Sequence, residues 1–129
     1  MDRFSFKLKV RDYECDMQGI VNNAVYQNYL ETARHEFLHS RGLSFAELTR
    51  QGIIIVVIRA EIDYRQPLRA EDEAIISVAV SQHSRLKMLF DQTIIRASDG
   101  QLMLEAKIYA AAMKDFKKPF FPEQLKALL

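Results

Sequence analysis

The chain of 129 residues is 49% hydrophobic and 27% charged, carries a net charge of +1 at pH 7, and contains one cysteine. These values are ordinary for a globular protein, so we expect residues 1–129 to form a single domain. The near-neutral charge argues against a nucleic-acid or anionic-membrane partner. The lone Cys15 excludes an internal disulfide and fits a cytoplasmic location, and the apolar runs are too short for a signal peptide or a membrane span.

The first part of the chain changes from a strand pattern to a helix pattern. Alternating apolar residues predict a strand over 4–13. From Asn22 the apolar residues recur at helical spacing, which predicts a helix of about five turns that ends before Gly42. The sequence Ser44–Glu47 is a capping box, so a second, short helix should follow and end at Gly52.

The rest of the chain has strand patterns only. The Asp99-Gly100 pair is a strong hairpin signal between the last two predicted strands. The order of elements predicts an α+β fold with an antiparallel sheet. The long helix is too apolar along one stripe to lie in water, so we expect the sheet to curve around it. The predicted strands are 53–66, 73–82, 86–97 and 102–114.

The segment before the long helix carries the first candidate for chemistry. Asp16 lies a few residues before the expected helix N-terminus, where free N–H groups and the positive end of the helix dipole gather. Such a carboxylate either caps a turn or attacks a carbonyl whose oxygen the N–H groups bind. Asn22 and Asn23 are both good N-cap residues. We expect Asn22 to cap the helix and the Asn23 backbone N–H to bind the oxyanion.

Three other side-chain patterns suggest different chemistry. His35 and His39 belong to an H-E-x-x-H sequence, which is typical of zinc sites. They fall on the polar face of the helix, and His83, on a distant strand end, is the only other histidine, so we predict no metal site. Glu31, on the same face, is a rival catalytic carboxylate. Cys15 has no neighbouring cation in the sequence and should be an inert thiol.

The segment over residues 11–37 resembles the N-terminal motif of the hotdog-fold acyl-CoA thioesterases, the 4-hydroxybenzoyl-CoA thioesterase-like group. A passage over residues 64–68, followed by Asp72, is similar to the strand-to-turn passage of the same family. The resemblance implies a hotdog fold, in which an antiparallel β-sheet wraps around one long central helix. The matching positions of the N-terminal motif are Asp16, Gly19, Val21, Tyr26, Tyr29, Glu31, Ala33 and Arg34.

The resemblance also implies an activity, which is hydrolysis of the thioester of an acyl-CoA to a carboxylic acid and CoA without a cofactor. Asp16 would be the general base or the nucleophile, assisted by Asn22 and Asn23 at the helix N-terminus. Family members are typically homodimers joined edge to edge, and many pair further into homotetramers. Arginine suits the phosphates of coenzyme A. The expected substrate contacts are Gly19, Ile20, Val21, Tyr26, Arg59, Ser84 and Arg85.

The chain departs from the family pattern near the helix start. Many relatives have an aromatic residue and a histidine in place of Asn22 and Asn23, and another branch has a histidine in place of Ile20. These differences leave the acyl chain open, and with it the choice between CoA and an acyl carrier protein. A non-catalytic protein that binds acyl-CoA is the alternative from another functional class.

Overall fold

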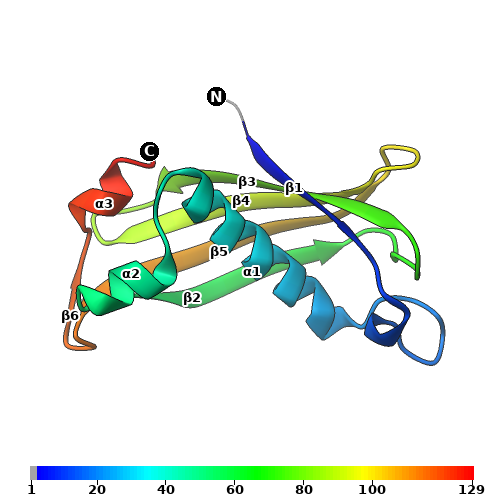
Figure 1. The fold of residues 1–129 in the computed structure, drawn as a ribbon, viewed down its shortest axis with the longest axis horizontal. Helices are drawn as coiled ribbons and strands as arrows, with labels where there is room; N and C mark the ends of the chain where they lie inside the picture. The colour runs from blue at the N-terminus through cyan, green and yellow to red at the C-terminus, as the bar shows by residue number, and fades with distance from the viewer. Residues whose placement is uncertain (1–2) are drawn as a thin grey trace.

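The computed structural model describes residues 3–129, so the first two residues of the expected domain lie outside it. The strands form one antiparallel sheet in the order β1-β3-β4-β5-β2, with β6 paired to the end of β5. The sheet curls around helix α1, which crosses its concave face (Figure 1). The elements are β1 (Phe4–Lys9), a 3₁₀ turn η1 (Asp12–Glu14), α1 (Asn23–Ser40), α2 (Phe45–Arg50), β2 (Ile53–Tyr64), β3 (Glu73–Gln82), β4 (Lys87–Arg96), β5 (Leu102–Lys114), β6 (Lys118–Phe120) and α3 (Glu123–Lys126).

Most of the predicted elements are confirmed, but two predicted strands are too long and two short elements were not predicted. The first strand stops at Lys9, since Asp12–Glu14 form the 3₁₀ turn and the Glu14 carboxylate accepts a hydrogen bond from the Arg11 N–H (2.8 Å). The strand expected over 53–66 ends at Tyr64. The chain also adds β6 and α3, because Asp115 and Phe116 adopt positive φ angles (52° and 60°) that reverse it after β5.

Helix α1 is held by a predicted stripe of apolar side chains that packs into the curl of the sheet. The side chains on this stripe are buried, whereas the opposite face of the helix carries exposed polar residues. Burying each large apolar side chain contributes roughly 1.5–3 kcal/mol, so packing dominates the stability of the helix. No helix within residues 3–129 has the length and hydropathy that crossing a membrane requires. The buried stripe consists of Tyr26, Tyr29, Leu30, Ala33, Phe37 and Leu38.

A buried polar pair connects α1 to the centre of the sheet. Arg34 is only 9% exposed, and its Nη1 donates a hydrogen bond to Gln92 Oε1 (3.0 Å). Gln92 Nε2 in turn donates to the Leu30 carbonyl (3.1 Å), and Gln92 is 1% exposed. Burial lowers the pKa of Arg34, since low dielectric disfavours the charged form. Gln92 is therefore the hydrogen-bond acceptor for the Arg34 guanidinium, which forms no salt bridge to a carboxylate within residues 3–129.

Replacing Gln92 by Leu should lower the free energy of unfolding by about 3 kcal/mol, because it leaves the buried guanidinium of Arg34 without its hydrogen-bond acceptor. Urea denaturation of the variant and the wild type measures this difference. Gln101→Leu is the matched control, since Gln101 is exposed in the β4–β5 turn. A Gln92→Leu variant as stable as this control would show that the pair contributes nothing.

Candidate functional site

A small loop over residues 15–21 places Asp16 next to the start of α1. Cys15 and Val21 form an isolated antiparallel bridge, and the Asp16 N–H donates to the Ile20 carbonyl (2.9 Å). Gly19 has a φ of +80°, a conformation that side chains disfavour, and its N–H donates to the Asp16 carbonyl (3.0 Å). The Val21 N–H donates to the Leu68 carbonyl (2.9 Å). These bonds fix the loop between the helix and the segment that follows β2.

The Asp16 side chain is exposed and held at one oxygen. Its Oδ1 accepts a hydrogen bond from the Gln18 N–H (2.8 Å), which is an Asx turn. Its other oxygen, Oδ2, makes no hydrogen bond to residues 3–129. The Asx turn therefore orients the carboxylate and leaves one oxygen available to a water molecule or a substrate.

The N-terminus of α1 leaves one backbone N–H, that of Asn23, without an acceptor among the described residues. The Asn22 side chain accepts a hydrogen bond from the Ala24 N–H (3.0 Å), and the Asn22 carbonyl accepts one from the Val25 N–H (2.9 Å). The predicted cap at Asn22 is thus confirmed. The Asn23 N–H has no hydrogen-bond acceptor among the described residues. This N–H can bind an anionic oxygen, with the positive end of the helix dipole behind it.

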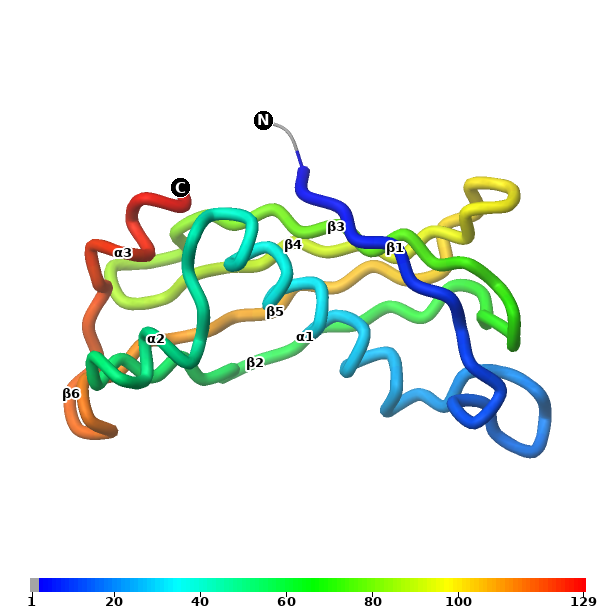
Figure 2. The backbone as a smooth tube through the Cα atoms, viewed as in Figure 1, coloured from blue at the N-terminus to red at the C-terminus, as the bar shows by residue number. Residues whose placement is uncertain are grey.

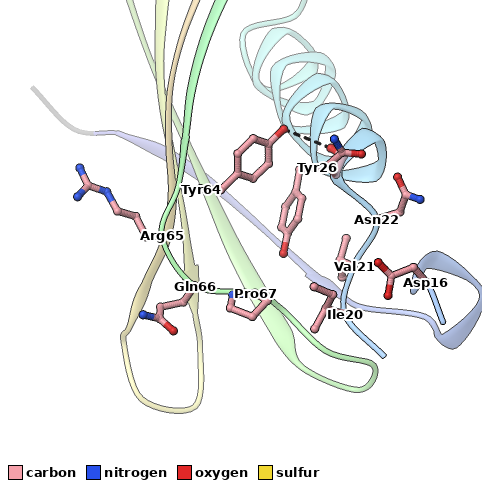
Figure 3. A pocket seen from close by; sticks show the side chains of 10 residues that line it. Asp16, Ile20, Val21, Asn22, Tyr26, Tyr64, Arg65, Gln66 and Pro67 are labelled. Carbon is pink, nitrogen blue, oxygen red and sulfur yellow. Dashed lines mark hydrogen bonds between the residues drawn. The ribbon is translucent and has the colours of Figure 1, made fainter. Parts of the chain in front are cut away.

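A cavity of about 380 Å³ joins these groups (Figure 3). One wall is the loop and the start of α1, and the other is the end of β2 with the segment after it. Sequence reasoning did not assign the second wall to the site, although residues 64–68 carry the family's strand-to-turn passage. The residues that line the cavity are Asp16, Ile20, Val21, Asn22, Asn23, Tyr26, Tyr64, Arg65, Gln66 and Pro67.

Three tyrosines support the cavity in different ways. Tyr26 is buried, and its hydroxyl accepts a hydrogen bond from the Leu68 N–H (2.9 Å). Burial raises the pKa of Tyr26, so its hydroxyl stays neutral. Tyr29 lies in the core, and its hydroxyl donates a hydrogen bond to Glu14 Oε1 (2.7 Å). The pKa of Tyr29 is raised mainly by burial and in addition by this hydrogen bond. Tyr64 meets the Tyr26 ring edge-on, with 5.6 Å between the ring centroids.

Four of the expected substrate contacts lie outside this cavity. Gly19 belongs to the loop but does not line the cavity. Arg59 lies over the Tyr109 ring (5.7 Å from the ring centroid) and 3.6 Å from the Glu61 carboxylate. Ser84 and Arg85 are exposed in the turn between β3 and β4, at the opposite end of the sheet from the loop that precedes α1 (Figure 2). Within one chain, neither Ser84 nor the two arginines line the cavity.

The geometry gives little support to a metal site on α1 or to Glu31 as the catalytic carboxylate. The His35 ring packs on Phe45 (4.4 Å between centroids), and its Nε2 lies 3.7 Å from the Glu31 carboxylate. Across residues 3–129, no group of three or more His, Cys, Asp or Glu side chains is placed to hold a metal ion. Glu31 lies on the exposed face of α1 and does not line the cavity that contains Asp16.

Comparisons with known proteins point to one family. The Thioesterase-like superfamily matches residues 10–129. The chain is 37% identical over 113 residues to the chloroplastic acyl-acyl carrier protein thioesterase ATL3 of Arabidopsis thaliana, covering 88% of this chain and 60% of that protein. This chain therefore spans about 60% of the length of the plant relative. It is also 33% identical over 102 residues to the long-chain acyl-CoA thioesterase FadM of Escherichia coli, covering 79% and 76%.

A solved structure confirms the fold. The 1,4-dihydroxy-2-naphthoyl-CoA thioesterase of Synechocystis superposes with a TM-score of 0.91 at 21% identity, covering 98% of this chain and 95% of that one. At this level of identity the likeness concerns the fold alone. The predicted hotdog architecture, a curled antiparallel sheet around a central helix, is thereby confirmed.

Proposed function

Because the chain belongs to the Thioesterase-like superfamily, we propose that it is an acyl-CoA thioesterase, which hydrolyses an acyl-CoA to a carboxylic acid and CoA. One observation carries the proposal. A single cavity is lined both by Asp16, whose Oδ2 makes no hydrogen bond within residues 3–129, and by Asn23, whose N–H has no acceptor there. The first can act on a carbonyl carbon or on the water that attacks it, and the second can bind the carbonyl oxygen.

The reaction requires an oxygen to add to the thioester carbonyl and the thiolate of CoA to leave. In one course, Asp16 takes a proton from water, the hydroxide adds to the carbonyl carbon, and the collapsing intermediate expels the thiolate. In the other, Asp16 itself adds to the carbonyl carbon, the intermediate expels the thiolate to form an anhydride, and water then hydrolyses the anhydride to the carboxylic acid and free Asp16. In both courses the carbonyl oxygen becomes negative beside the Asn23 N–H. The geometry supports both courses.

A second candidate substrate is the thioester of an acyl carrier protein. It is favoured by the similarity to ATL3, whose name is that of an acyl-acyl carrier protein thioesterase. The reacting groups would be the same, because only the carrier of the acyl thioester changes. The two substrates therefore need to be compared directly.

The test is the release of free thiol from acyl-CoAs with short, long, branched and aromatic acyl groups, and from the same acyl groups on a carrier protein. We expect turnover of at least one acyl-CoA. Preference for the carrier-protein thioesters would favour the second candidate. Tight binding of acyl-CoA without thiol release would contradict the enzymatic proposal and would leave a binding protein.

We also propose that the chain forms a homodimer through β2. Within residues 3–129 this strand pairs with β5 on one side only, and it exposes half of the Val57 and Ile58 side chains. A long, unpaired edge strand with exposed apolar side chains is a surface that proteins normally cover. Two β2 strands paired antiparallel about a two-fold axis would continue the sheet across both subunits. Sedimentation should therefore show a dimer, or a tetramer after further pairing, and a monomer at micromolar concentration would contradict this proposal.

Such a dimer would change the position of the cationic residues that do not line the cavity within one chain. Antiparallel pairing of β2 reverses one sheet relative to the other. The end of the partner's sheet that carries the β3–β4 turn then lies on the same side as the cavity of the first subunit. We propose on this ground that Arg59, Ser84 and Arg85 contact the phosphates of coenzyme A bound to the neighbouring subunit.

The proposed reaction needs no metal or other cofactor, because Asp16 and the helix N-terminus provide both the base and the oxyanion site. Turnover should therefore be the same before and after treatment with a chelator. A loss that added zinc restores would contradict this expectation. The cytoplasmic location inferred from the sequence stays a prediction.

A further inference from the structure

Tyr64 places a hydroxyl group in the cavity that Asn23, with its unbonded N–H, also lines. It is the last residue of β2 and lines the cavity, and it is 50% exposed. Its hydroxyl donates a hydrogen bond to the Asn23 carbonyl at 3.4 Å (Figure 3). Hydroxyl donors usually lie about 2.7–2.8 Å from their acceptor, so this bond is long and weak.

The neighbouring Tyr26 differs from Tyr64 because its hydroxyl makes a short, buried hydrogen bond. Its hydroxyl is committed to the buried Leu68 N–H, and its ring forms part of the core. The same ring supports Tyr64 from the side, with an edge-on contact. Tyr64 is half exposed, so its side chain can turn and its hydroxyl can exchange a weak acceptor for a stronger one.

We propose that the Tyr64 hydroxyl is the second donor to the thioester carbonyl oxygen, next to the Asn23 N–H. This inference rests on the proposed thioesterase activity and adds a catalytic residue to it. Tyr64 and Asn23 line the same cavity, but the Asn23 carbonyl that Tyr64 now contacts points along α1 away from the Asn23 N–H. To reach an oxygen bound to that N–H, the hydroxyl has to leave this carbonyl and swing toward the N-terminus of α1 by rotation of the half-exposed Tyr64 side chain.

The chemistry favours this exchange as the reaction proceeds. The Asn23 carbonyl is a neutral acceptor, whereas the oxygen of the tetrahedral intermediate is negative, and hydrogen bonds to charged acceptors are stronger. Tyr64 keeps its proton throughout, so the balance of atoms in the reaction is unchanged. The donor contributes more as charge develops, which predicts a larger effect on kcat than on KM.

The test combines kinetics of Tyr64→Phe with binding of two unreactive CoA analogues. The ketone analogue has a CH₂ group in place of the thioester sulfur and keeps the carbonyl, whereas the alkyl thioether lacks the carbonyl. We expect kcat to fall about 10- to 100-fold and KM to rise only several-fold. The kcat loss is less than that of a fully buried donor because Tyr64 is half exposed. The variant should bind the ketone several-fold more weakly and the thioether unchanged.

Tyr13→Phe is the control, since Tyr13 is exposed and its hydroxyl makes no hydrogen bond within residues 3–129. Equal loss of affinity for both analogues would overturn the proposal, because the ring rather than the hydroxyl would then be responsible. Unchanged kcat would overturn it as well. If wild-type protein hydrolyses no thioester, the proposed function fails, and the two analogues still test Tyr64 by binding alone.

Discussion

Replacing Asp16 by Asn is expected to lower kcat by at least about two orders of magnitude, the range lost when a general base is removed. The variant should fold normally, because the Asn side-chain oxygen can still accept the hydrogen bond from the Gln18 N–H that forms the Asx turn. Free-thiol release and the melting temperature, measured on the same preparation, separate the loss of chemistry from a loss of structure.

The matched control for this variant is Glu31→Gln, which neutralises the rival carboxylate on the exposed face of α1. The ratio of the two kcat values decides between the carboxylates. If Asp16→Asn retains wild-type turnover and Glu31→Gln loses it, the assignment of Asp16 is wrong and the acidic residue within the helix carries the reaction.

A second large effect is expected from Asn23→Pro, which removes the proposed oxyanion donor without removing the helix. Asn23 is the first residue of α1, where proline is favoured since its fixed φ suits the helix and its missing N–H has no partner within the helix. The preceding Asn22 has φ −62° and ψ 138°, the extended conformation that a following proline requires. Loss of one oxyanion donor costs about 2.7–4 kcal/mol of barrier, so kcat should fall about 10²–10³-fold.

The comparison for this variant is Asn23→Ala, which keeps the N–H and removes only the side chain. We expect Asn23→Pro to turn over about two orders of magnitude more slowly than Asn23→Ala, with similar melting temperatures. Equal kcat values for the two variants would show that the backbone N–H is not a donor to the oxyanion. Circular dichroism checks that α1 is retained.

The elements that the sequence predicts well depend on neighbours along the chain. The cap at Asn22 and the β4–β5 hairpin at Gly100 are local hydrogen-bonding patterns, and both are present. The stripe on α1 follows from helical spacing. The 3₁₀ turn at Asp12–Glu14 was missed because the apolar alternation continues past Lys9, and only the Glu14 side-chain bond to Arg11 shows where the strand ends.

The sequence predicts the wall of the cavity that carries Asp16 but not the wall that carries Tyr64, for a related reason. Asp16, Asn22 and Asn23 lie within eight positions of one another, so their proximity follows from the chain itself. Tyr64 meets Asn23 across a separation of 41 residues, which depends on the length and curl of β2. The distance between the β3–β4 turn and the cavity depends likewise on strand lengths and on which strands are paired. Their roles stay predictions that the variants above can test.

The main chain of Leu68 joins the two walls of the cavity. Its carbonyl accepts the Val21 N–H, and its N–H donates to the Tyr26 hydroxyl, so the loop, the helix and the segment after β2 are tied at one buried residue. The exposed side chains of Arg65 and Gln66 lie on the rim of the cavity and take no part in this tie. New acyl preferences can therefore arise, by natural variation or by design, through changes at the rim that leave the positions of Asp16 and Asn23 unaltered.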